Sequence, residues 1–144
     1  MIEQDTVRLL RECDSGAKMG IDAFSDVLAR TKSNGLRTLL SQAKKEHEDL
    51  SQNVRRELAR FKDQGKQPSA AASAMSWIKT HAELTLNDSD ETIADLMTDG
   101  CGMGVKSLSK YLNQYKAADE SSKELAKALI SMEDRLVKDL RAYL

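Results

Sequence analysis

Apolar residues recur along the first part of the chain at alternating spacings of three and four, which is typical of an amphipathic helix. One row of such positions comprises Val7, Leu10, Asp14, Ala17, Ile21, Phe24 and Leu28. A second row beside it comprises Leu9, Cys13, Gly16, Gly20, Ala23 and Val27. Two adjacent rows predict a helix from about Glu3 to Lys32 that packs against two neighbours. Ser33, Asn34 and Gly35 then suit a left-handed helix end.

The same spacing continues after this break and predicts a second helix from about Leu36 to Gln64. Its core row, flanked by further leucines, comprises Leu36, Leu40, Ala43, His47, Leu50, Val54 and Phe61. Each helix would be ~45 Å long, and the very short connection forces the two to lie antiparallel. Gly65 and Pro68 end this hairpin, because proline does not continue a helix.

The second half of the chain predicts another helical hairpin. Asp88 and Glu91 have the spacing of a capping pair, and the helix that follows has its core positions at Ile93, Leu96, Met97, Gly100, Gly104, Leu108, Tyr111, Leu112 and Tyr115. Ser121 and Glu124 have the same spacing. The last helix has its core positions at Leu125, Leu129, Met132, Leu136, Leu140 and Tyr143.

Ser69 to Leu86 predicts a shorter, alanine-rich helix between the two hairpins, with Trp77 at the end of the bundle. We therefore expect an all-α protein with a single domain over residues 1–144. Two up-down hairpins joined by a long crossover that contains a short helix form the ferritin-like four-helix bundle. The alternative is a simple bundle in which the 69–86 helix packs as a fifth member.

Charge and cysteine usage narrow the class of protein. The net charge is −1, and charged residues, 31% of the chain, are interleaved in sign, which argues against nucleic-acid binding. Met1–Asp5 has no basic segment followed by an apolar run, so we expect no secretory signal there. No apolar run reaches the ~20 residues that a membrane span needs. Cys13 and Cys101 form no Cys-x-x-Cys pair. Free thiols in a reducing cytoplasm are expected.

The residues that hold metals in ferritin-like bundles are missing. Those bundles place a Glu on each of two helices and a Glu-x-x-His pair on each of the other two. Here His47 follows Lys44 at that spacing, and His81 follows Ile78. The sequence therefore predicts no catalytic residue, no metal site and no other cofactor.

Two ionisable residues lie inside the apolar rows, Asp14 on the first helix and His47 on the second. Because a buried charge needs a partner, we expect them to pair with each other or with Lys or Arg near an edge of the bundle. The alternative is a residual metal or oxidoreductase site built from Asp14, Glu46 and His47, with Glu133 as a further ligand.

Glycines four residues apart occur on two helices, at Gly16 and Gly20 and at Gly100 and Gly104. The favoured interpretation is a close approach of helix backbones. The alternative is a kink or hinge at Gly100–Gly104 that opens a small-molecule pocket. The neighbouring Cys13 and Cys101 are expected to be buried thiols, and a soft-metal site with nearby methionines is the alternative.

The order of features after Pro68 resembles a known family. Trp77-Ile78-Lys79, then Leu84 to Asp88, then the cysteine–glycine stretch and Tyr111-Leu112 are similar to bacterial proteins catalogued as domain of unknown function 2383. That resemblance implies a ferritin-like bundle in a bacterial cytoplasm with no established activity. Similar sequences carry a Gly-Glu-Asp type of turn after the cysteine, where this chain has Gly102-Met103-Gly104. The acidic ligand candidate is thus replaced by uncharged residues.

The resulting hypothesis is a non-catalytic bundle that acts through protein–protein contact, most simply as a homodimer. It rests on the missing ligands and on apolar residues outside the narrowest core row, namely Leu9, Val27 and Leu58. The alternative functions are the metal-binding protein or oxidoreductase and the small-molecule pocket at Gly100–Gly104.

Overall fold

The computed structural model describes residues 2–66 and 88–144. These residues form four α-helices and a final 3₁₀ turn and contain no strand: α1 (Ile2–Leu28), α2 (Asn34–Arg60), α5 (Asp90–Gln114), α6 (Glu120–Leu140) and η1 (Arg141–Tyr143). The all-α prediction is thereby confirmed. The helix expected from Ser69 to Leu86, with Trp77, lies outside the described residues.

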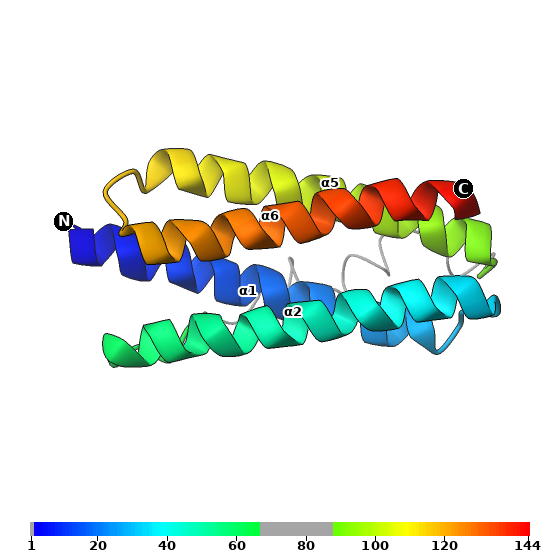
Figure 1. Ribbon diagram of the computed structural model, residues 1–144, viewed down its shortest axis with the longest axis horizontal. Helices are drawn as coiled ribbons and strands as arrows, with labels where there is room; N and C mark the ends of the chain where they lie inside the picture. The colour runs from blue at the N-terminus through cyan, green and yellow to red at the C-terminus, as the bar shows by residue number, and fades with distance from the viewer. Residues whose placement is uncertain (1, 67–87) are drawn as a thin grey trace.

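The described helices lie side by side along one axis (Figure 1). α1 and α2 form one antiparallel hairpin, as the short connection predicted, and α5 and α6 form another. α5 runs in the same direction as α2, so α2 ends and α5 begins at opposite ends of the bundle. Among the described helices, none is long and apolar enough to cross a membrane.

The core consists of two clusters of buried side chains, one in each half of the bundle. One cluster includes Phe24, Val27 and Cys101, and the other includes Leu9 and Leu58. Leu9 and Val27 are 0% exposed and Leu58 is 1% exposed. These three residues belong to the core of the single chain, so they do not supply the self-association surface that was expected of them.

The turn between α1 and α2 differs from the expected left-handed helix end. Ser33 is extended, with φ −69°, and its hydroxyl accepts from the backbone N–H of Leu36 as the N-cap of α2. Gly35 lies within α2. The left-handed residues of the described chain follow α2 instead, at Lys62 (φ 56°) and Gly65 (φ 86°).

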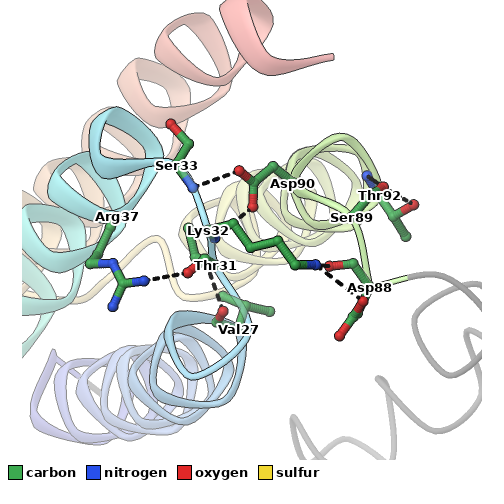
Figure 2. Close-up of polar contacts among 9 residues, drawn as sticks. All are labelled: Val27, Thr31, Lys32, Ser33, Arg37, Asp88, Ser89, Asp90 and Thr92. Carbon is green, nitrogen blue, oxygen red and sulfur yellow. Dashed lines mark hydrogen bonds and ion pairs between the residues drawn. The ribbon is translucent and has the colours of Figure 1, made fainter.

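Asp90, the first residue of α5, holds this turn from the other hairpin. Figure 2 shows its carboxylate between two backbone amides, and it accepts from Ser33 N at 2.7 Å and from Lys32 N at 2.9 Å. The N–H of Lys32, followed by that of Ser33, lowers the pKa of Asp90 from its ordinary value. The N-cap of α5 is Ser89, which accepts from Thr92 N, and not Asp88. Asp88 pairs with Lys32 at 3.4 Å.

The opposite end of the bundle has the reciprocal arrangement. The turn between α5 and α6 donates to two residues of α1: Ala117 N to Asp5 at 3.0 Å and Asp119 N to the hydroxyl of Thr6 at 2.8 Å. Asp119 also caps α6 by accepting from Ser122 N, so the expected start at Ser121 is wrong. Each hairpin turn is thus held by side chains of the other hairpin.

Candidate functional site

A buried pair of ionisable side chains crosses the middle of the bundle. His47 on α2 is 1% exposed and Glu133 on α6 is 9% exposed. Nε2 of His47 lies 2.5 Å from Oε1 of Glu133, and Nδ1 lies 2.7 Å from the carbonyl oxygen of Ala43. Phe24 packs edge-on against the imidazole, with 4.9 Å between the ring centroids. Both ends of the imidazole are therefore satisfied inside the core.

The hydrogen bonds of His47 fix the charge of the pair. Because a carbonyl oxygen only accepts, the hydrogen between His47 and Ala43 is on Nδ1. The short contact between Nε2 and Oε1 holds a second hydrogen, on the nitrogen or on the oxygen. An imidazolium beside a carboxylate and a neutral imidazole beside a carboxylic acid have the same total charge. The pair is therefore uncharged as a whole, wherever that hydrogen lies.

Two buried thiols lie in different core clusters. Burial, together with Glu133, raises the pKa of Cys101, and the thiol hydrogen-bonds the Glu133 carboxylate. Burial, followed by Glu12 and Asp14, raises the pKa of Cys13 to about 12. Both cysteines are free and buried, which confirms the prediction of buried thiols. Because they belong to separate clusters, they do not share one packing site.

Asp14 pairs with cations and a backbone amide. Its Oδ2 accepts from Lys18 Nζ at 2.6 Å and from Lys66 N at 3.1 Å, and its Oδ1 lies 3.6 Å from Nε of Arg55. The predicted pairing with Lys or Arg is confirmed for Asp14. For His47 the prediction is wrong, because its partner is Glu133 and neither Asp14 nor a Lys or Arg.

Of the four residues named for a metal site, His47 and Glu133 come together, whereas Asp14 and Glu46 lie apart from them. Glu46 pairs with Arg135 at the surface, 3.3 Å away, while Asp14 and His47 have the separate partners given above. Within residues 2–66 and 88–144, no three His, Cys, Asp or Glu side chains are grouped as metal ligands. A Cβ on Gly20 would lie 3.0 Å from His47, and one on Gly104 would lie 3.8 Å from Glu133. Glycines thus occupy the facing positions on α1 and α5, and the donor set does not fit a di-metal centre.

The glycines make room for side chains and not for a neighbouring backbone. The nearest atoms to a Cβ on Gly16, Gly20 or Gly104 belong to the side chains of Leu129, His47 and Glu133. The interpretation as a close backbone approach is therefore wrong at these positions. α5 runs unbroken through Gly100–Gly104, so the expected local break is also absent from this described helix.

A cavity of about 390 Å³ lies between α1 and α5, beside these glycines. Its glycine wall comprises Gly16, Gly20, Gly100 and Gly104. Its apolar walls comprise Met19, Ala23, Phe24, Met97, Leu108 and Leu129. Cys101 and Glu133 line it at the buried pair. The glycines therefore create space, because their missing side chains leave a hollow that Glu133 lines.

The other polar lining residues form a paired group. Lys66 Nζ lies 2.7 Å from Glu12, and this hydrogen bond raises the pKa of Lys66. Tyr111 also hydrogen-bonds Glu12, and burial is the main reason that the Tyr111 pKa is raised. The acid and the base at this part of the cavity therefore neutralise each other.

A second hollow of about 420 Å³ lies against α1 and the end of α2. It is more open to solvent and is lined by Lys18, Arg55, Leu58, Asp63 and Gln64. Its two cations already pair with Asp14. We therefore regard the less open and mostly apolar cavity between α1 and α5 as the better candidate site.

The sequence pattern identified Glu133 as a candidate ligand and not as a residue of the core. On α6 the buried residues are Ser122, Ala126, Leu129, Glu133, Leu136 and Leu140. Glu133 lies between Leu129 and Leu136 at the same spacing that places His47 between Ala43 and Leu50. That shared spacing was the available signal for a buried pair. Comparisons with family models, curated proteins and solved structures found no match.

Proposed function

We propose that this protein is a non-catalytic helical bundle that binds a small apolar molecule between α1 and α5. The observation that carries the proposal is the cavity of about 390 Å³, which falls within the range of about 300–1,000 Å³ typical of ligand sites. Mostly apolar walls with a few polar groups are also typical of such sites. The site is suited to binding, because His47 and Glu133 already satisfy each other.

The destabilising effect of glycine inside helices supports the same proposal. A glycine inside a helix costs up to about 1 kcal/mol relative to alanine. Four glycines line one cavity on two facing helices, and α5 remains a continuous helix through two of them. A bundle selected for stability alone would fill this space with larger side chains. Retained space at the expense of stability is typical of functional sites.

Occupation of the cavity can be tested with a neutral fluorescent probe, N-phenyl-1-naphthylamine. The native protein should bind it saturably at one site, with the rise in emission that follows transfer to apolar surroundings. Gly104→Leu places a side chain in the cavity and should weaken binding about tenfold or more, in line with the ~1–3 kcal/mol of overpacking.

The matched control is Gly102→Leu, on the same helix. A Cβ on Gly102 would meet nothing within 4 Å, and Gly102 is not among the lining residues. This variant should bind like the native protein, with both helix contents checked by circular dichroism. Equal binding by the two variants, or no binding by the native protein, would refute the proposal.

We also propose that this chain is a ferritin-like bundle that belongs to the bacterial group named above and is located in a reducing cytoplasm. Two observations support it. α2 and α5 run in the same direction, as in bundles with one long crossover. Cys13 and Cys101 are free thiols. Equal numbers of reactive thiols with and without reductant, after unfolding of the protein purified from its natural source, would be the expected result.

A homodimer is a separate and narrower proposal. Its original support, Leu9, Val27 and Leu58, belongs to the core of the single chain. What supports it now is Met103, 54% exposed and at the edge of the α1–α5 cavity. Light scattering at high protein concentration should give twice the mass of one chain, and a monomer mass would refute the dimer.

A further inference from the structure

We infer that the cavity between α1 and α5 selects an uncharged, ring-containing molecule that carries one hydroxyl group, donated to Glu133. This inference rests on the proposed function, since it names the class of ligand for the same site. Three features of the cavity support it: the charge of the cavity, the acceptor that it presents, and the side chains that form its walls.

The part of the cavity beside Glu133 carries no net charge. The pair of His47 and Glu133 carries two hydrogens, one on Nδ1 facing Ala43 and one between Nε2 and Oε1, and is neutral as a whole. Cys101, the third polar group there, is a buried thiol. A ligand cation beside Glu133 would therefore lack a counterion, because His47 already balances the carboxylate. A ligand anion would be repelled by the carboxylate oxygens.

The rest of the polar lining is also balanced. Glu12 and Lys66 form an ion pair at 2.7 Å, and Tyr111 donates to the same carboxylate. Among the described lining residues, no charged group is left to match a charge on a ligand. Transfer of an unpaired charge into apolar surroundings is strongly unfavourable. The cavity therefore favours an uncharged molecule.

Glu133 provides a hydrogen-bond acceptor that faces this space. Its Oε1 is taken by His47, whereas its Oε2 lies 3.9 Å from the position of a Cβ on Gly104, which is a lining residue. The side chain is 12% exposed, and Glu133 itself lines the cavity. A carboxyl oxygen accepts more than one hydrogen bond. A hydroxyl group on the ligand is the uncharged donor that fits.

The walls favour rings over a flexible chain. Three methionines and two aromatic residues are among the lining residues, namely Met19, Met97, Met103, Phe24 and Tyr111. Thioethers make favourable contacts with aromatic rings and adapt to irregular shapes. Scaling from a ~150 Å³ cavity that binds benzene gives room for about 15 non-hydrogen atoms. A bicyclic aromatic alcohol is of this size and chemistry.

A set of naphthalene probes tests each part by isothermal titration calorimetry at neutral pH. 1-Naphthol should bind about fivefold more tightly than naphthalene or 1-methoxynaphthalene, because one net hydrogen bond is worth about a fivefold change in affinity. 1-Naphthoate and the 1-naphthylmethylammonium ion should bind at least tenfold more weakly than 1-naphthol. 1-Decanol, an aliphatic alcohol with as many non-hydrogen atoms, should also bind more weakly.

The role of Glu133 is tested with two variants. Glu133→Leu should lower the affinity ratio of 1-naphthol to naphthalene to near one, whereas Glu133→Gln, which keeps an acceptor oxygen, should retain the preference. If Glu133→Leu fails to fold, the affinity ratio of 1-naphthol to 1-methoxynaphthalene on the native protein still tests whether the ligand hydroxyl donates a hydrogen bond.

The outcomes separate the two proposals. Binding of none of the probes, together with no binding of N-phenyl-1-naphthylamine, would overturn the proposed function itself. Suppose that naphthalene binds, but the anion, the cation, the methyl ether or 1-decanol binds as tightly as 1-naphthol or more tightly. That result would support the binding site and overturn the ligand class.

Discussion

Gly65 follows α2 in a conformation that few other residues adopt, with φ 86°. Its N–H donates to Asp63 at 2.8 Å, and the next N–H, of Lys66, donates to the buried Asp14 at 3.1 Å. A Cβ on Gly65 would collide with Oδ2 of Asp14. The glycine is therefore required both by the backbone angle and by the carboxylate that it approaches.

Gly65→Ala should reduce the free energy of unfolding by about 1–3 kcal/mol, because it combines an unfavourable φ with that collision. The measurement is urea denaturation followed by circular dichroism. Gly102→Ala is the control, since a Cβ there meets open space within a helix, and it should stabilise by up to about 1 kcal/mol. An alanine variant at position 65 as stable as the native protein would show that the loop relaxes away from Asp14.

The His47–Glu133 pair should behave as one unit in a double-mutant cycle. His47→Leu or Glu133→Leu alone should destabilise by about 3–5 kcal/mol, because each leaves a buried polar group without its partner. The double variant should be far more stable than the sum of the two effects predicts, since both polar groups are removed together.

The surface pair Glu46–Arg135 provides the control for that cycle. Its side chains are 34% and 64% exposed and 3.3 Å apart. Replacement of both by alanine should give a coupling energy no larger than about 1 kcal/mol. A coupling energy between His47 and Glu133 as small as that of the surface pair would contradict a shared hydrogen in the core.

At the scale of helices and turns, Asp90 should make the contact between hairpins sensitive to acid. Two backbone N–H groups lower its pKa below the ordinary value of 3.8. The stability that the charged carboxylate contributes is thus fully present above about pH 4 and is lost as the pH falls through the lowered pKa. Asp90→Asn should destabilise by about 1 kcal/mol at neutral pH, and this difference from the native protein should shrink below pH 4.

Asp88→Asn is the matched control for Asp90. Asp88 has the same charge two residues earlier, but its partner is the exposed Lys32 at 3.4 Å. An exposed ion pair contributes little, so this variant should lie within about 0.5 kcal/mol of the native protein across the same pH range. Equal losses in the two variants would mean that charge, and not the hydrogen bonds of Asp90, holds the turn.

The buried positions along the helices were predictable from the sequence, whereas the residues at which the helices begin were not. The paired rows on the first helix contain Leu10, Cys13, Ala17 and Val27, all of which are buried in α1, because burial follows the helical period. Several residues before α5 have the chemistry of a cap. Ser89 takes that role while Asp90 reaches the other hairpin, and a local pattern does not contain that distant use.

The candidate site was predictable only in part, for a related reason. Asp14 and His47 were identified because each interrupts an apolar row. The partner of His47 is 86 residues away, so the pairing depends on how the two hairpins align along the axis. The cavity depends on the same alignment, because it exists only where glycines of α1 and α5 face each other.

At the scale of the whole molecule, the two thiols report on each half of the core separately. Cys13 and Cys101 belong to different clusters, and burial raises the pKa of both. Since the thiolate is the reactive form, neither should react with a charged disulfide reagent in the native protein. Two single-cysteine variants, Cys13→Ala and Cys101→Ala, should be labelled at the same rate if the bundle opens as one unit.

Labelling in urea at concentrations below the unfolding transition measures those rates. Much faster labelling of Cys101 than of Cys13 would mean that the half of the core that contains Cys101 opens by itself. Unequal rates would then contradict a single cooperative bundle.

The contacts that each hairpin makes with the turn of the other also determine how the two hairpins align along the bundle axis. Heptad-like core rows repeat about every two helical turns, so a shifted alignment would still bury apolar side chains. Such a shift would pull Asp90 away from Lys32 and Ser33 at one end and Thr6 away from Asp119 at the other. Because the contacts at both ends form together in one alignment only, they select that alignment. In that alignment His47 lies level with Glu133, and two glycine-bearing helix faces lie opposite each other.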